Sequence, residues 1–297
     1  MYIHVGFEIT LECDGATPLL LALSPRPEEG HRLISPGPIR TAPWMPLESF
    51  MDAFGNRVTR LVAGPGPLAI WSEAIVEDSG AADAVNWGAP QLPIEALPAA
   101  TLGYLLPSRY CEADMLADEA WRRFGDTQPG WPRVQAICDF VHDHIAFGYG
   151  FASTAKTAAD VLRDGRGVCR DFAHLAIALC RAMNIPARYA SGYLGDIGVP
   201  PAGPGDFCAW FEVFLGGCWY TFDARYNTPR IGRVLMARGR DAADVAMITS
   251  FGSYRMTGFE VWADEVKGVT AADAARRAIA GRRGAPLAGR ELSVVTA

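Results

Sequence analysis

Apolar-rich runs of strand length dominate the first third of the chain. They are separated by turn-forming segments such as Cys13-Asp14-Gly15 and Gly64-Pro65-Gly66-Pro67, because glycine and proline interrupt regular structure. Phe54-Gly55-Asn56 is typical of a hairpin turn. The predicted strands cover residues 2–11, 19–24, 57–63 and 69–76. Short strands at this spacing favour a β-sandwich-like module.

The pattern changes from strand to helix after residue 105. Residues 108–125 and 131–146 carry apolar positions at helical spacing. The second of these segments has Pro132 near its start, where a helix tolerates proline. We therefore predict a helical region between the β module and the segments that carry candidate chemistry.

The strongest helix signal begins at Cys169, directly after the chain-breaking Gly165-Arg166-Gly167. This helix extends to about Met183, and Asn184-Ile185-Pro186 ends it. Further strands are predicted at residues 187–194, 207–215 and 219–223. The fold class is thus α+β, with an N-terminal β domain at 1–103, a core at 104–268, and a C-terminal helix and tail at 269–297.

Composition narrows the function classes for this chain of 297 residues. Its formal net charge is −6 and it has no basic block, which argues against a nucleic-acid or acidic-membrane partner. The N-terminus lacks a secretory pattern, and no apolar stretch is long enough to cross a membrane. The seven cysteines are scattered without CxxC spacing, so we expect a reducing, cytoplasmic location and no disulfide framework.

Three motifs follow one another in the second half of the chain. They are Gly167-Val168-Cys169 at a helix start, Cys208-Ala209-Trp210 in a strand, and Phe222-Asp223 in the next strand. This order resembles the bacterial transglutaminase-like superfamily of cysteine peptidases, in which a G-V-C helix start precedes an H-A-W strand and an F-D strand. The resemblance implies a papain/transglutaminase-like core, in which a cysteine-bearing helix packs on an antiparallel sheet. It also implies catalytic roles for Cys169, Asp223 and position 208.

The position of Cys169 at a helix start favours a role as nucleophile, independently of the resemblance to the family. A thiol at a helix N-terminus lies among unpaired backbone N–H groups and at the positive end of the helix dipole, and both stabilise the thiolate. Only the thiolate is an effective nucleophile. We therefore expect Cys169 to be the most reactive of the seven cysteines.

Hairpin geometry predicts which residues accompany it. If Gly216-Gly217 is a two-residue turn, Trp210 lies opposite Asp223 on the neighbouring strand. Because side chains alternate along a strand, Cys208 and Trp210 then share a face with Asp223. Cys208 and Asp223 become diagonal neighbours, roughly 7–8 Å apart at the backbone. An orienting carboxylate is therefore expected beside position 208.

The chain departs from the family pattern at position 208, where Cys208 replaces the expected histidine. A thiol has an ordinary pKa of about 8.5 and lacks the second nitrogen that a carboxylate orients, so it does not replace imidazole as a base. His174 lies about 140° around the helix from Cys169 and is expected in the core. Nothing in the sequence directs His142 or His144 to the site.

Three interpretations of this site remain open. The first is acyl transfer or amide hydrolysis by Cys169 on a peptide or amino-acid-derived substrate, without a cofactor. The second is a two-thiol acid/base isomerase, a racemase or epimerase, that uses Cys169 and Cys208. The third is a metal-binding or non-catalytic binding protein, with Cys169, Cys208 and Asp223 as metal ligands. Trp210 and Arg166 are the weaker candidates for contact with a substrate.

Overall fold

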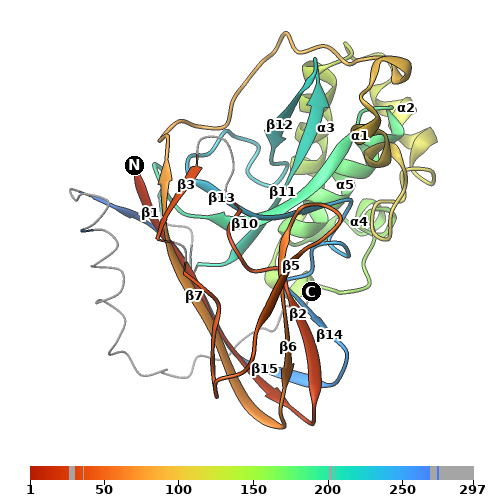
Figure 1. Ribbon diagram of the computed structural model, residues 1–297. Coiled ribbons are helices and arrows are strands. Elements are labelled where there is room, and N and C mark those ends of the chain that lie inside the picture. The colour runs from red at the N-terminus through yellow and green to blue at the C-terminus, as the bar shows by residue number, and fades with distance from the viewer. Residues whose placement is uncertain (27–30, 36, 201–202, 204, 268–272, 274–297) are drawn as a thin grey trace.

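The computed structural model describes residues 1–26, 31–35, 37–200, 203, 205–267 and 273. A β-sandwich and a helical core with its own sheet make up the protein (Figure 1). The long strands of the sandwich lie below the helices in that view, and the core sheet lies between those strands and the helices.

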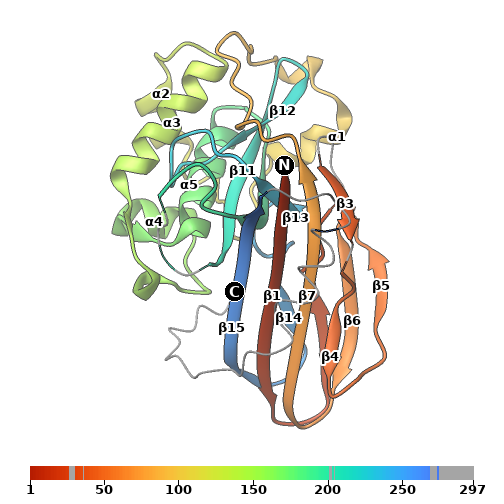
Figure 2. The same ribbon diagram turned by 90° about the vertical axis from the view of Figure 1, so that its left-hand side faces the viewer.

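The first sandwich sheet has five strands, in the order β15-β1-β7-β3, with β4 also paired to β7. All of its pairs are antiparallel. The strands are β1 (Tyr2–Cys13), β3 (His31–Ser35), β4 (Arg40–Ala42), β7 (Gly66–Asp78) and β15 (Tyr254–Val266). Figure 2 shows β15, β1 and β7 side by side along most of the height of the molecule.

The second sandwich sheet has four strands in the order β14-β2-β6-β5. The strands are β2 (Thr17–Leu21), β5 (Glu48–Met51), β6 (Arg57–Ala63) and β14 (Ile248–Ser250). Apolar side chains from both sheets, among them Phe7, Leu19 and Leu61, share one buried cluster. Burial of this shared cluster away from water holds the two sheets together.

The helical core is built around a long buried helix, α5 (Cys169–Ala182), whose residues from Arg170 to Arg181 are all buried. Helices α2, α3 and α4 contact α5, and so do two strands of the core sheet. The other helices are α1 (Ala99–Leu102), α2 (Ala117–Phe124), α3 (Trp131–His144) and α4 (Ala158–Asp164), with single 3-10 turns at η1 (Ile94–Ala96), η2 (Gly103–Leu105) and η3 (Tyr149–Phe151). Figure 2 shows α2, α3 and α4 to the left of the core sheet.

The core sheet is antiparallel and has the order β12-β11-β10-β13. Its strands are β10 (Ala187–Leu194), β11 (Phe207–Leu215), β12 (Cys218–Phe222) and β13 (Arg233–Gly239). A separate parallel pair joins β8 (Ala146–Phe147) to β9 (Arg166–Gly167), and β9 lies just before the start of α5 in the chain.

The α+β fold class, with a cysteine-bearing helix against an antiparallel sheet, is confirmed. The predicted helix over 108–125 is wrong at its start, because residues 108–116 form turns and bends and the helix begins at Ala117. The segment assigned to the core also contains β14 and β15, which pair with β2 and β1 of the sandwich. The sandwich is therefore completed by strands from both ends of the described chain.

The C-terminal helix and tail expected at 269–297 lie outside the described residues, apart from Asp273. Within the ranges that the structure describes, no helix has the length and apolar character that a membrane crossing requires.

Candidate active site

The site begins at the N-terminus of α5, where Cys169 is the first helical residue and is half-buried. The Asp171 carboxylate accepts a hydrogen bond of 2.8 Å from the backbone N–H of Val168, which fixes the start of the helix. A side chain at Gly167 is excluded, because an added Cβ would lie 2.5 Å from the Cβ of Asp171. The Gly-Val-Cys segment thus sets where the thiol lies.

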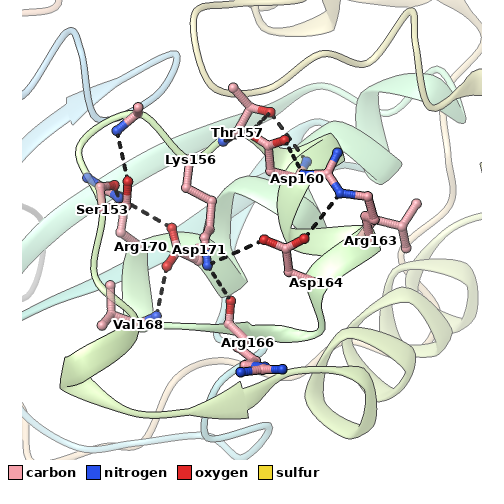
Figure 3. A network of polar contacts seen from close by, with 12 residues as sticks. Ser153, Lys156, Thr157, Asp160, Arg163, Asp164, Arg166, Val168, Arg170 and Asp171 are labelled. Atoms are coloured by element: carbon pink, nitrogen blue, oxygen red, sulfur yellow. Dashed lines mark hydrogen bonds and ion pairs between the residues drawn. The ribbon is translucent and has the colours of Figure 1, made fainter.

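A polar network supports this helix start from outside (Figure 3). The Arg170 guanidinium donates to the Ser153 carbonyl and contacts the Asp171 carboxylate. Lys156 donates to the Arg166 carbonyl at 3.1 Å and its ammonium lies 3.9 Å from an Asp164 carboxylate oxygen. These contacts connect α4 and the loop before it to α5, so the position of the thiol depends on more than its own helix.

Strand β11 brings Cys208 to the first turn of α5. Cys208 is buried and packs in a small cluster with Trp210 and Leu235, against which Cys169 also packs. Opposite Cys208 on β10 is Gly192, where an added Cβ would lie 2.2 Å from the Val234 carbonyl oxygen. Glycine is therefore required where β10 passes between Cys208 and β13.

The two thiols form an unequal pair. A hydrogen bond from Cys208 lowers the pKa of Cys169, against the effect of burial, and the Ala209 N–H and the positive charge of Arg225 also lower it. The same hydrogen bond, followed by burial, raises the pKa of Cys208 well above its ordinary value. The Cys208 S–H donates to the Ala209 carbonyl oxygen at 3.7 Å, and a Cys169 thiolate would be a second, charged acceptor for the same proton. Of the two thiols, Cys169 is therefore the one that loses its proton first as pH rises.

Asp223 follows β12 and lies close enough to Cys208 for its charge to raise the pKa of that thiol. The hairpin turn at Gly216-Gly217 has two residues with positive φ, of 57° and 92°, and pairs Leu215 with Cys218 as predicted. The Asp223 carboxylate accepts hydrogen bonds from the N–H groups of Arg225 and Tyr226. Its other oxygen accepts from Arg233 at 2.9 Å.

Arg233 thus binds Asp223 on one side, and on the other its Nε donates to Asp83 at 2.9 Å. All three groups are largely buried. Both oxygens of the Asp223 carboxylate are therefore engaged, one by two backbone N–H groups and the other by Arg233.

A second carboxyl group, Asp206, lies near the thiols and was not singled out from the sequence. It precedes Cys208 by two residues, so both side chains leave the strand on the same face, and its charge acts on Cys169. Burial raises the pKa of Asp206 to about 6, against hydrogen bonds from the Phe207 N–H and the Tyr149 hydroxyl. Tyr149 keeps its proton, because burial raises the pKa of its hydroxyl to about 12.

Arg225 lies close enough to Cys169 for its positive charge to lower the pKa of that thiol. Its guanidinium carbon lies 3.6 Å from the centre of the Phe147 ring and 4.7 Å from that of Tyr226. Burial opposes its charge, but Tyr226 and the thiols Cys169 and Cys208 together raise the pKa of Arg225.

The structure brings together Cys169, Cys208 and Asp223 of the predicted site residues. Trp210 lies beside Cys208, but its ring is 2% exposed and the Arg233 guanidinium lies 5.1 Å from its centre. Trp210 is therefore a buried packing residue of the site, and its ring is not accessible to a substrate. Arg166 is exposed, and its guanidinium lies 5.7 Å from the centre of the Phe151 ring.

The histidines whose side chains are described are occupied elsewhere. His174 is fully buried, stacks on Tyr110, and accepts a hydrogen bond from the Ala242 N–H, so it is neutral. Burial lowers the pKa of His174 well below its ordinary value. His142 contacts the Arg225 carbonyl and His144 the Leu162 carbonyl. The prediction that His174 is a core residue is confirmed.

Over the described part of the chain, no group of three or more histidine, cysteine, aspartate or glutamate residues is arranged to hold a metal ion. The Asp223 carboxylate is already bound by Arg233 and two backbone N–H groups. The ligand set considered from the sequence is therefore not assembled in this structure.

Comparison with known proteins agrees with this geometry. The family model of the transglutaminase-like superfamily matches residues 119–224, a range that contains Cys169, Cys208 and Asp223. A crystal structure of a candidate cysteine protease from Cytophaga hutchinsonii is 30% identical, with a TM-score of 0.82, over 91% of this chain and 92% of that one. The chain belongs to the transglutaminase-like superfamily.

Bacterial relatives of this superfamily member extend the similarity. An uncharacterized protein of Mycobacterium leprae is 27% identical over 226 residues, which cover 73% of this chain and 80% of that protein. An uncharacterized protein of Mycobacterium tuberculosis is 31% identical over 132 residues, or 39% of this chain and 41% of that protein. The match to the Cytophaga structure covers the sandwich as well as the transglutaminase-like core, so the two parts occur together in another protein.

Proposed function

We propose that this protein is a cysteine-dependent acyltransferase or amidohydrolase that uses Cys169 as its nucleophile on a peptide or amino-acid-derived substrate. The observation that carries the proposal is the half-buried Cys169 thiol at the start of α5, packed beside Cys208, whose interaction with it lowers the Cys169 pKa. A depressed pKa makes more of the thiol a thiolate near neutral pH, and the thiolate is the reactive form.

Cys208 has a supporting role in this scheme. Because its own pKa is raised well above the ordinary value, it keeps its proton and donates it in a hydrogen bond. An imidazolium in the more usual arrangement stabilises a thiolate as both a charge and a donor. Cys208 supplies the donor, and Arg225 supplies the charge.

In the reaction, the Cys169 sulfur attacks a carbonyl carbon and forms a carbon–sulfur bond. The backbone N–H groups of Cys169 and Arg170, at the very start of α5, are suitably placed to stabilise the oxyanion, because the first N–H groups of a helix have no partner within it. When the carbon–nitrogen bond breaks, the leaving amine takes a proton and a thioester remains on Cys169. Water or a second amine then attacks the thioester, gives up a proton, and releases the thiolate.

Asp206 is the best proton carrier for these two steps. A carboxyl group with a pKa of about 6 is close to the pH at which it must act, which favours both giving and taking a proton. It gives one to the leaving amine and takes one from the attacking water or amine, so it ends in its starting state. Tyr149, which donates a hydrogen bond to Asp206, holds the carboxyl group in place.

The two-thiol isomerase is less consistent with this geometry. Such an enzyme needs its sulfurs on opposite sides of a substrate carbon, with one as acid and one as base. Here Cys169 packs against the small cluster that contains Cys208, and the two thiols act on each other's pKa, so they do not face one another across an open space.

The proposal is tested with p-nitrophenyl acetate, because an activated ester reports acyl transfer without knowledge of the natural acyl group. We expect a burst of about one equivalent of nitrophenolate followed by slower turnover, the pattern of an acyl-enzyme. The Cys169→Ala variant should lose the burst, whereas Cys218→Ala, which removes an exposed cysteine of the core sheet, should keep it. A burst that survives in Cys169→Ala would show that another group is the nucleophile.

A further inference from the structure

We propose that Arg225 binds a free carboxylate of the substrate beside Cys169, so that the protein acts on peptide- or amino-acid-derived amides that carry a carboxylate close to the bond attacked. The inference rests on the proposed function of Cys169 and adds the substrate class to it.

The guanidinium of Arg225 is held in place without being neutralised. It lies 3.6 Å from the centre of the Phe147 ring and 4.7 Å from that of Tyr226, and it is half-buried. Its backbone N–H is fixed by the Asp223 carboxylate at 3.0 Å, and its carbonyl by His142 at 2.9 Å. Among the residues with described side chains, none forms a hydrogen bond or ion pair with this guanidinium.

The surroundings distinguish Arg225 from the other arginines nearby. Arg233 is bound by Asp223 and Asp83, and Arg170 by Ser153 and Asp171. Both are buried, and each already has a carboxylate partner. Arg225 is only half-buried and lies close enough to both thiols for their charges to act on it, so it combines proximity to them with access for a ligand.

A guanidinium stacked on aromatic rings keeps its N–H donors directed outward along its edge, in the fork that matches a carboxylate. Phe147 and Tyr149 are both partly exposed and lie 5.3 Å apart between ring centres. They form an accessible aromatic surface beside the charge. A substrate carboxylate on Arg225 would therefore place the neighbouring carbonyl carbon close to the Cys169 sulfur.

Asp206 is a carboxyl group that competes for this charge, since the charge of Arg225 lowers its pKa. Burial nevertheless raises the pKa of Asp206 to about 6, and its oxygens already accept from Phe207 and Tyr149. The Arg225 guanidinium is consequently available to a ligand.

The inference is tested by alkylating Cys169 with iodoacetate and, separately, with iodoacetamide. The two reagents are nearly the same size, but only iodoacetate carries a carboxylate. Both react with the thiolate, so the ratio of their rates at Cys169 cancels any change in thiol pKa that a mutation causes. The ratio is measured by mass spectrometry of the peptide that contains Cys169 and requires no enzymatic turnover.

We expect the iodoacetate-to-iodoacetamide ratio to fall at least about tenfold in Arg225→Gln, since a charge-assisted hydrogen bond is lost. Arg225→Lys should retain part of the preference as a point charge without the fork. Arg109→Gln is the matched control, because Arg109 is exposed and stacks on Tyr110 with a separation of 4.8 Å. Its ratio should equal that of the unmodified protein.

A second measurement needs no variant. N-acetylglycine should protect Cys169 of the unmodified protein from iodoacetamide at lower concentrations than N-acetylglycinamide, which lacks the carboxylate. Equal protection by the two compounds, or an unchanged rate ratio in a folded Arg225→Gln protein, would overturn the carboxylate site alone. A Cys169 no more reactive than Cys218 toward either reagent would overturn the proposed function and this inference with it.

Discussion

Replacing Cys208 by alanine should raise the pKa of Cys169. The Cys208 thiol is the main group that lowers that pKa, and alanine removes the donor with little change in size. The Ala209 N–H, the positive charge of Arg225 and the helix N-terminus would remain to stabilise the thiolate. The variant therefore isolates one hydrogen bond of the site.

The size of the effect follows from the strength of a hydrogen bond to a charged group, about 1.5–3 kcal/mol. Since about 1.4 kcal/mol is a tenfold change in an equilibrium constant, the loss should raise the pKa of Cys169 and lower its thiolate fraction by about ten- to a hundredfold. Sulfur is a weak donor, which favours the lower end of that range. At any pH below both pKa values, a rise of one unit lowers the thiolate fraction, and with it the rate of alkylation, about tenfold.

The assay is the pH dependence of iodoacetamide alkylation at Cys169, followed on the peptide that contains it. The rate should increase with pH through the pKa of Cys169, and the midpoint should move to higher pH in Cys208→Ala. Cys208→Ser keeps an O–H donor and should leave the midpoint nearer to that of the unmodified protein. An unchanged midpoint in Cys208→Ala would refute the assignment of the hydrogen bond as the cause of activation.

Three further predictions concern stability. Asp206→Asn should increase the free energy of unfolding by about 2–3 kcal/mol at about pH 8 and by little near pH 4. The reason is that the raised pKa of Asp206 makes the folded protein lose stability as pH rises toward 6. Urea unfolding at several pH values measures this difference. Asp223→Ala should lower the free energy of unfolding by about 3 kcal/mol, because it removes one partner of the buried Arg233. Gly167→Ala should lower it by about 1–3 kcal/mol and slow alkylation of Cys169, whereas Gly64→Ala, whose Cβ meets nothing within 4 Å, should change neither.

Each of these predictions has a contrary result. A difference between Asp206→Asn and the unmodified protein that does not vary with pH would show that burial does not perturb this carboxyl group. An Asp223→Ala protein as stable as the Arg32→Ala surface variant, whose ion pair with Glu77 is solvent-exposed, would contradict the role of Asp223 as the partner of Arg233. Equal effects of the two glycine substitutions would contradict the requirement for glycine before the catalytic helix.

Patterns of neighbouring residues correctly predicted the strands, the helix start and the turn that depend on interactions close in sequence. The ranges of β6, β10 and β11 agree with the sequence, and α5 begins at Cys169 as predicted. The Gly216-Gly217 hairpin has the predicted register, because a two-residue turn fixes the pairing of its strands. Because side chains alternate along the strands of this hairpin, its register correctly predicted that Asp223 lies near Cys208.

Long-range pairing left no comparable signal. Strand β15 pairs with β1 across nearly the whole chain length, and nothing in either segment specifies the other. The helix predicted from residue 108 failed because Cys111 and Ala113 are buried in turns rather than on a helix face. Over so short a segment, apolar residues that are buried by tertiary packing give the same sequence pattern as the apolar face of a helix.

The ion-pair partners of the site were similarly hidden from sequence. Asp223 was expected to orient position 208, but Arg233, ten residues further along, binds its carboxylate. Asp206 had a usable signal, since it shares a strand face with Cys208 at a spacing of two residues. Arg225 became a candidate only once Phe147 was known to lie 3.6 Å from its guanidinium.

The most direct test of the central claim is to locate the acyl group after a brief reaction with p-nitrophenyl acetate at neutral pH. Peptide mass spectrometry then compares the seven cysteines within the same molecules. The claim predicts an acetyl group on Cys169, at about one per chain, before the exposed Cys218 is labelled. Acetylation of Cys218 ahead of Cys169, or a fully folded protein in which Cys169 stays unmodified, would contradict it.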